Sequence, residues 1–238
     1  MRKLVATVAA ASLLTLTACS EPKPEVRIAA DPSNPEQMVL AEIYRQVVEL
    51  DGRQVGIIPV DLPDDNAKLG ILQVGDANLA VLCVGSLVVQ GNPGESQQLI
   101  DAAKQHSATP NGAAPAEGES DEGSIDLPLA TYDAAVGTLP ANLKTIDPSP
   151  AEGCMDQEHG DLPNNIIPVF QAGIFDRGVK RAMGQATRAL STDDLEELVE
   201  KSKADSDPAP AVNEWLMEKT GMGAELRRIV DEGEAREA

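Results

Sequence analysis

Two kinds of apolar pattern alternate over the first part of the chain. The runs VRIAAD (26–31), QVGIIPVDL (54–62) and NLAVLCVG (78–85) are typical of buried strands. Between them, Met38–Leu50 and DDNAKLGILQVG (64–75) carry apolar residues at helical spacing. A strand–helix–strand order with apolar strands predicts a parallel sheet covered by helices, and therefore an α/β fold.

The first predicted helix carries clear start and stop signals. Asn34 has the side chain of a good N-cap, and Pro35 suits the first helical position because no amide hydrogen is needed there. Asp51-Gly52 ends this helix, and Gly75 ends the next one.

The middle of the chain changes in composition. Between Lys104 and Ser124 it is rich in Gly, Pro, Ser and acids and has no apolar periodicity, which predicts a disordered insert with a solvated His106. Order resumes with a predicted helix at LPLATYDAAVGTLP (127–140). Two further strands are predicted at NLKTIDPSP (142–150) and NNIIPVF (164–170).

The C-terminal part has the pattern of a helical tail. Ser191, with Asp194 three residues later, forms a capping-box pattern in front of one of its helices. The predicted helices cover DRGVKRAMGQATRAL (176–190), STDDLEELVEKSK (191–203), PAPAVNEWLMEKTG (208–221) and AELRRIVDEGEA (224–235). Together with the strands, they predict a single α/β unit over residues 26–235.

The N-terminus has the pattern of a lipoprotein signal peptide. Arg2 and Lys3 precede an apolar run that is too short to span a bilayer in the mature chain. The run ends in LTAC, which looks like a bacterial lipobox. We expect cleavage after residues 1–18, lipidation of Cys19, and a short tether (19–25) that anchors an extracytoplasmic domain to the cell membrane. The alternative is an ordinary secretory peptide with a chance cysteine.

Charge and aromatic content exclude several classes of protein. A formal net charge of -20 is repelled by nucleic acid and by anionic membranes, so we expect membrane attachment through the lipid anchor only. Aromatic residues make up 2 %, so a site built from several stacked rings cannot be assembled. The chain has no Gly-x-Ser-x-Gly elbow, His-Glu-x-x-His helix or phosphate-binding glycine loop. We therefore expect neither enzymatic activity nor a cofactor.

The stretch GCMDQEHGDLP (153–163) concentrates candidate reactive groups, among them Cys154 and His159. A zinc site needs about four ligands, and a Cys–His nucleophile needs a free, oriented thiol, so both remain alternatives. In an oxidising compartment two leftover cysteines usually pair. Cys83 and Cys154 both follow apolar strands, which should bring them to the carboxyl edge of one sheet. We therefore predict a Cys83–Cys154 disulfide and no metal site.

Four segments resemble, in order, the substrate-binding proteins of glycine betaine/choline-type ABC transporters. They are VRIAADPSNPEQMVLAEIYRQVVELDGRQVGI (26–57), LGILQVGDANLAVLCVGSLV (69–88), LPANLKTIDPSPAE (139–152) and ALSTDDLEELVEKSKADSDPAPAVNEWLMEKTG (189–221). The resemblance covers most of the chain outside the predicted insert and the signal peptide. It implies a periplasmic-binding-protein type II-like fold.

The resemblance also implies a second lobe that this chain lacks. In that family the lobe follows the segment matched by DPSPAE, before the chain returns through one like NNIIPV. Here only GCMDQEHGDLP lies between them, which is enough for a turn but too short for a lobe with its own core. We therefore expect mainly one lobe, with a parallel or mixed sheet flanked by helices and a helical C-terminal tail.

The function implied is delivery of a small zwitterionic or quaternary-amine solute to an ABC permease. The family holds quaternary ammonium groups in a cage of aromatic rings, and Tyr132 is the only ring near a suitable element here. The alternative is a lipid-anchored interaction or regulatory protein that kept the fold and lost small-molecule binding.

Open α/β sheets bind ligands at the carboxyl edge of their strands. The ligand-binding residues expected there are Ser33, Asn34, Gln37, Gly85, Ser86, Tyr132 and Asn165. The helix N-terminus at Ser33–Asn34 is suited to bind a betaine carboxylate. The alternative is that these two residues serve only as the cap of the helix.

Overall fold

The computed structural model describes residues 23–61, 64–108 and 125–222. Cys19, the predicted signal peptide and the last predicted helix (224–235) lie outside these ranges. Within them, no helix is both long and apolar enough to cross a membrane.

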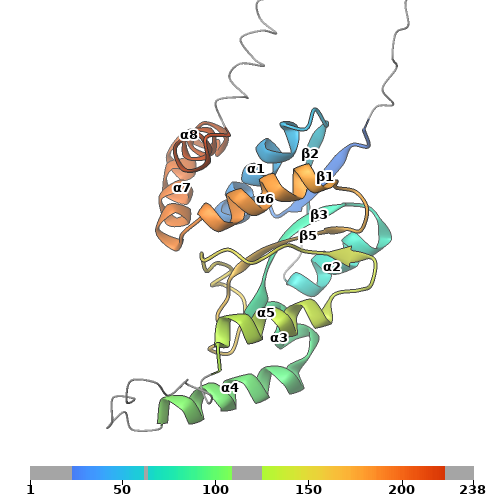
Figure 1. Cartoon of the computed structure of the whole chain (residues 1–238). Helices are drawn as coiled ribbons and strands as arrows, with labels where there is room; N and C mark the ends of the chain where they lie inside the picture. The colour runs from blue at the N-terminus through green and yellow to red at the C-terminus, as the bar shows by residue number, and fades with distance from the viewer. Residues whose placement is uncertain (1–22, 62–63, 109–124, 223–238) are drawn as a thin grey trace, which may run out of the picture.

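Five described strands form one mixed sheet in the order β2-β1-β3-β5-β4 (Figure 1). They are β1 (Val26–Ala30), β2 (Val55–Pro59), β3 (Leu79–Cys83), β4 (Leu143–Lys144) and β5 (Ile166–Gln171). The first three run parallel, as the apolar pattern predicts, whereas β5 is antiparallel to both β3 and β4. Because β5 is reversed, its first residue, Ile166, lies opposite Cys83, the last residue of β3.

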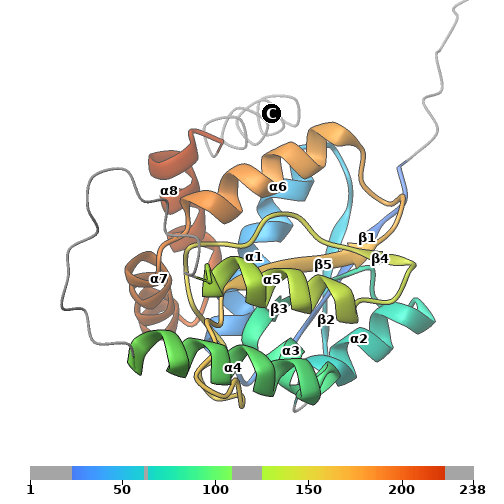
Figure 2. The same ribbon diagram turned by 60° about the horizontal axis from the view of Figure 1, so that its bottom comes forward.

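Helices cover both faces of the sheet and make a three-layer molecule (Figure 2). One face is covered by α1 (Pro35–Glu49), α6 (Arg177–Ala189), α7 (Thr192–Asp205) and α8 (Ala209–Thr220). The other is covered by α2 (Asp65–Val74), α3 (Val84–Gly91) and α5 (Leu127–Thr138), while α4 (Pro93–Ala108) packs against α3 and α5. The predicted fold class, an α/β lobe with a mixed sheet flanked by helices, is confirmed.

The central strands are buried on both faces. Along β1 and β3, Ile28 and Val81 pack into the core beneath α1, whereas Ala29 and Leu82 pack into the core beneath α2 and α3. This alternation follows from the two-residue period of a strand. It explains why these strands read as continuous apolar runs.

The C-terminal helices are part of the core and do not form a separate tail. Val212, Trp215 and Leu216 of α8 are buried in the same cluster as Ile43 and Val47 of α1. Trp215 is the only tryptophan of the chain.

Local helix signals are confirmed. The Asn34 side chain caps α1, with Pro35 in its first turn, and Gly75 ends α2 with a left-handed φ of 84°. Ser191 and Asp194 form the reciprocal capping box of α7.

Two features differ from the expectation. The strand predicted at 142–150 contracts to β4, because Pro148 and Pro150 have no amide hydrogen to offer a sheet. The sequence patterns also do not predict α3 or α4, and α4 continues to Ala108, into the range of the predicted insert. The α3 sequence VGSLVVQG is apolar on nearly all sides, so it has no stripe that distinguishes a helix from a strand.

Between β4 and β5 the chain makes only turns, bends and one bridge, from Glu152 to Asn165. We call residues 145–165 the joint. It stands where the resemblance places a second lobe, and it contains no helix and no extended strand. The structure therefore has the single lobe that the short connection predicts.

The predicted disulfide is present between Cys83 and Cys154, with Cα atoms 6.2 Å apart. The expectation that both cysteines follow strands was wrong for Cys154, which lies in the joint. The two still meet because reversed β5 begins at the edge where β3 ends, so the joint must return to that edge.

Candidate functional site

A groove lies where β1 ends, between the β1–α1 loop, the joint and α7. It consists of two adjoining hollows of about 430 and 440 Å³ that share Glu36, Met155, Val199 and Lys203. Its other lining residues are Asp31, Ser33, Asn34, Pro35, Glu152, Asp156, Thr192, Leu195, Glu196 and Glu200. We call this surface the edge groove. Each hollow falls in the size range of small-molecule sites, and this edge is where open α/β sheets bind ligands.

The β1–α1 loop is held by its own short polar side chains. Asp31 Oδ1 accepts hydrogen bonds from the backbone amide and the hydroxyl of Ser33, both at 2.7 Å. Asn34 Oδ1 accepts from the Gln37 amide at 3.2 Å, and Asn34 Nδ2 faces Asp156 Oδ2 at 3.5 Å. Ser33 and Asn34 therefore line the groove and also serve the loop and the cap.

Glu36 ties the joint to α1 at the centre of the groove. Its Oε1 accepts a hydrogen bond from the Cys154 amide at 2.7 Å. Burial raises the pKa of Glu36 above its usual value, and neighbouring Asp156 adds to the rise. In contrast, the hydrogen bonds from Ser33 lower the pKa of Asp31 and so favour its charged form.

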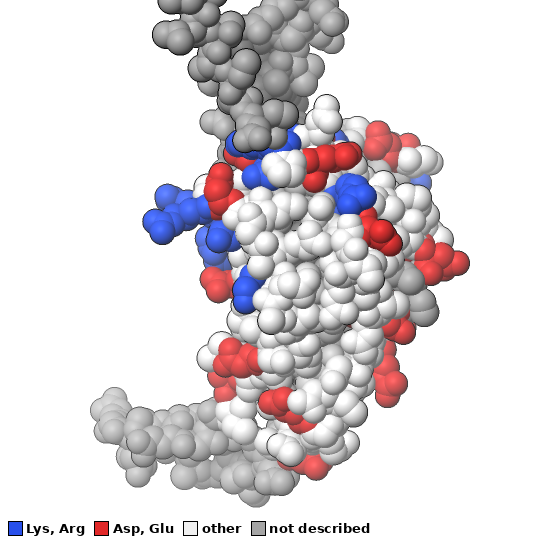
Figure 3. All heavy atoms as spheres, turned by 90° about the vertical axis from the view of Figure 1, so that its right-hand side faces the viewer, with Lys and Arg blue, Asp and Glu red and all other residues white. Residues whose placement is uncertain are grey.

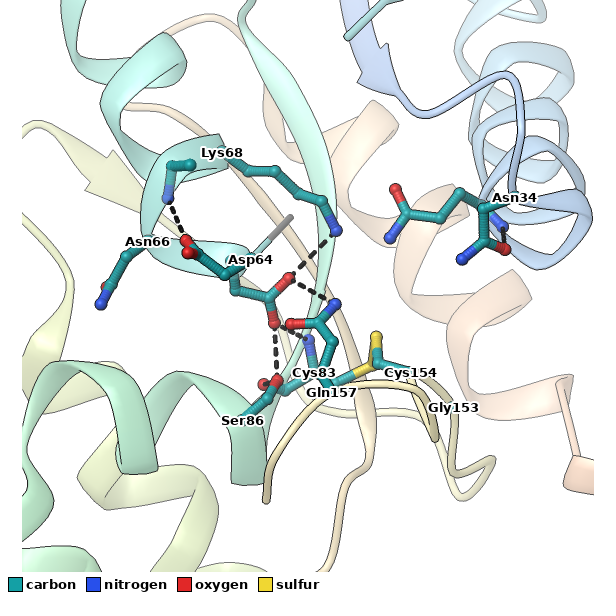
Figure 4. A network of polar contacts seen from close by, with 12 residues as sticks. Asn34, Asp64, Asn66, Lys68, Cys83, Ser86, Gly153, Cys154 and Gln157 are labelled. Atoms are coloured by element: carbon teal, nitrogen blue, oxygen red, sulfur yellow. Dashed lines mark hydrogen bonds and ion pairs between the residues drawn. A yellow bond between two sulfur atoms is a disulfide. The ribbon is translucent and has the colours of Figure 1, made fainter. Parts of the chain in front are cut away.

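The Asp65 carboxylate of α2 collects donors from α2, β3, α3 and the joint. Figure 4 shows these donor residues, Lys68, Cys83, Ser86 and Gln157, around one network of polar contacts. The carboxylate is fully buried and pairs with Lys68 Nζ at 3.1 Å. It also accepts from Ser86 Oγ at 2.7 Å, from the Cys83 amide at 3.1 Å and from Gln157 Nε2 at 3.3 Å. Since a buried charge is tolerated only when it is paired and hydrogen-bonded, this network fixes α2, β3, α3 and the joint relative to one another.

Asn164 holds the other end of the joint. This residue is 1 % exposed, and its Oδ1 accepts from the Ser86 amide at 2.9 Å. Its Nδ2 donates to the carbonyls of Gly153 and Cys154 at 2.8 and 3.3 Å. The side chain therefore closes the joint on itself and fastens it to α3.

The other predicted ligand-binding residues lie outside the lining of the edge groove. Ser86 is fully buried and donates to Asp65, and a side chain at Gly85 would meet the Pro163 carbonyl at 2.8 Å. The Tyr132 hydroxyl donates to the Ile146 carbonyl at 3.3 Å, and Asn165 Nδ2 donates to the Pro150 carbonyl at 3.4 Å.

Gln37 follows the lining residue Glu36 in the sequence but does not itself line the edge groove. It is 7 % exposed, and its side-chain amide has no hydrogen-bond partner among the described residues. The amide is not among the described buried side-chain atoms that lack a partner, so it is accessible to solvent.

Sequence reasoning missed most of the groove. Glu36 reads as an ordinary acid in the first turn of a helix, and α7 reaches the groove only through its packing on α1. One local signal was present: Met155 directly follows Cys154, so the disulfide holds this apolar side chain at the edge, where it is 64 % exposed.

The reactive-site alternatives find no support in the geometry. The described residues hold no group of three or more His, Cys, Asp or Glu side chains arranged to bind a metal. Cys154 is consumed by the disulfide, so it offers no thiol to His159, whose Nδ1 lies 3.1 Å from the Leu162 carbonyl.

Comparisons with solved structures find similar folds. The chain is similar to a structure described as a glycine betaine/carnitine/choline ABC transporter, with a TM-score of 0.58 and 12 % identity, over 84 % of this chain and 99 % of the other. It is also similar to apo YehZ from Escherichia coli, with a TM-score of 0.50 and 11 % identity, over 84 % and 99 %. No protein-family model and no curated protein matches the sequence. At these identities the likeness shows the fold.

Proposed function

We propose that the protein is the extracytoplasmic solute-binding component of a glycine betaine/choline-type ABC uptake system. The edge groove carries the proposal, because it is a solute-sized hollow at the ligand-binding edge of the sheet. The shared fold and the four resembling segments support it. In this proposal lipidated Cys19 anchors the domain, and a membrane permease receives the solute.

Binding of a small solute tests the proposal. Calorimetry on the purified full chain with glycine betaine, choline, carnitine, proline and 1,4-diaminobutane should show saturable binding of at least one of them. A Val199→Trp variant should abolish that binding, because the indole fills the shared part of the groove. Val74→Trp is the matched control, since Val74 is 73 % exposed and lies outside the lining.

A second candidate is an interaction protein that kept the fold. It is favoured by the joint, since a single lobe has no second lobe to close over a bound solute. Calorimetric titrations that show no binding heat for any of these solutes, together with direct binding of a purified permease, would contradict the solute-binding proposal and support this alternative.

A further inference from the structure

The edge groove is strongly biased toward negative charge. Its lining contains six carboxyl side chains, namely Asp31, Glu36, Glu152, Asp156, Glu196 and Glu200, and a single ammonium, Lys203. That ammonium is already paired with Glu200 at 2.8 Å. By contrast, the side of the molecule that faces away from α7 carries Lys and Arg side chains beside its acids along its upper part (Figure 3). A cation is therefore the solute that the groove attracts.

The groove also has an apolar floor. Met155 lies in the part shared by both hollows and is 64 % exposed, and Val199 and Leu195 of α7 lie beside it. Exposed methionine side chains adapt to ligands of varied shape. A hydrocarbon chain that lies along this floor buries apolar area, while a charged end meets the carboxylates.

Among the described residues, no aromatic ring lines the edge groove. Tyr44 and Trp215 are buried on α1 and α8, and Phe170 and Phe175 pack on each other with centroids 5.1 Å apart. A quaternary ammonium group has no N–H and is held by ring faces, which this site does not offer. Carboxylates instead make their strongest contacts with N–H donors, through charge-assisted hydrogen bonds.

We propose that the edge groove binds a small alkyl amine whose protonated nitrogen keeps its N–H donors, in preference to a quaternary ammonium solute. This inference rests on the proposed function and assigns the chemical class of its ligand. Glu36 and Asp156 receive the ammonium where the two hollows meet, and Met155 and Val199 contact the hydrocarbon chain.

Two ligands with the same charge and the same carbon chain test the proposed chemical class of the ligand. Titration calorimetry compares 1,4-diaminobutane with its fully N-methylated analogue, which has the same two charges and four-carbon chain but no N–H. Each charge-assisted hydrogen bond lost costs roughly tenfold or more in affinity, so the methylated analogue should bind at least about tenfold more weakly. Equal or tighter binding of the analogue would overturn the proposal.

A pair of variants on one helix tests the location. Glu196 and Glu197 are neighbouring, exposed residues of α7, but only Glu196 lines the edge groove, while Glu197 pairs with Lys201 at 2.8 Å. Glu196→Gln should weaken 1,4-diaminobutane binding about two- to fivefold, and Glu197→Gln should leave it nearly unchanged. Equal effects of both variants would show attraction by overall charge only, and would contradict the site.

The central carboxylate gives a larger expected effect. Glu36→Gln keeps an oxygen for the Cys154 amide but removes the charge, so the affinity for 1,4-diaminobutane should fall at least about tenfold. If the amine fails to bind while glycine betaine or choline binds, this inference fails and the proposed function stands. If no solute binds, both fail.

Discussion

At the scale of single residues, the most consequential group is the buried carboxylate of Asp65. Its four partners come from α2, β3, α3 and the joint, so one side chain connects segments that are far apart in the sequence. The ammonium of Lys68 is 1 % exposed, and Asp65 is its hydrogen-bond partner in the described structure. Lys68 therefore depends on Asp65 for its hydrogen bond more than Asp65 depends on Lys68.

This difference predicts how stable the two single variants and the double variant should be relative to one another. Asp65→Ala leaves the buried Lys68 without its hydrogen-bonded ion-pair partner and should lower the free energy of unfolding by about 3–5 kcal/mol. Lys68→Met should cost clearly less, because the Asp65 carboxylate keeps donors from Ser86, Cys83 and Gln157. The double variant should be more stable than Asp65→Ala alone, since it removes the buried ammonium that has lost its hydrogen-bonded partner.

Urea unfolding monitored by circular dichroism measures all three variants. A double variant that is less stable than Asp65→Ala would show that the ammonium is not the source of the loss.

At the scale of elements, α3 and the joint form a tight contact where sequence reasoning expected a ligand. The first turn of α3 lies against the Pro163 carbonyl and the Asn164 side chain. Gly85 is needed there because the joint leaves no room for a β-carbon, and no solute is required to explain it.

Two glycine substitutions separate close packing from helix propensity. Gly85→Ala places a β-carbon 2.8 Å from the Pro163 carbonyl oxygen and 3.0 Å from Asn164 Oδ1, so it should destabilise the protein by about 1–3 kcal/mol. Gly70→Ala in α2 meets nothing within 4 Å and should stabilise it by about 0.5–1 kcal/mol. Thermal unfolding of the two variants checks the predicted loss of stability for Gly85→Ala and the predicted gain for Gly70→Ala. A stabilised Gly85→Ala protein would contradict the close packing.

At the scale of the whole molecule, the disulfide joins two positions of the lobe that are far apart in the sequence. Cys83 and Cys154 are separated by 71 residues of sequence, so the bond restricts a long loop in the unfolded chain. It also holds the segment that carries Met155 and the Cys154 amide at the edge groove. Fold stability and groove geometry therefore depend on the same covalent bond.

Reduction should therefore weaken the fold. A phosphine reductant should lower the free energy of unfolding by about 4 kcal/mol in the chain-entropy model. A Cys83→Ala/Cys154→Ala variant is the control, because its stability should not respond to the reductant. Labelling of Cys83 or Cys154 by a thiol reagent in the denatured, unreduced protein would speak against the bond.

How much the sequence predicts depends on the range of the interaction. The boundaries of α1, α2 and α7 follow from caps at Asn34, Gly75 and Ser191, which act within a few residues. The disulfide was predicted because only two cysteines remain after Cys19. The edge groove was not predicted beyond Ser33 and Asn34, because α7 and the joint reach it only through tertiary packing and the reversal of β5.

The position of Trp215 makes the protein its own optical reporter. The chain's one indole is 6 % exposed between α8 and α1, and its Nε1 has no hydrogen-bond partner. Its emission therefore reports on one position, at the border of the core and a hollow lined by charged side chains, without overlapping signals from other tryptophans. Since α8 packs against α7, which forms one wall of the edge groove, that single fluorophore lies one helix away from the edge groove.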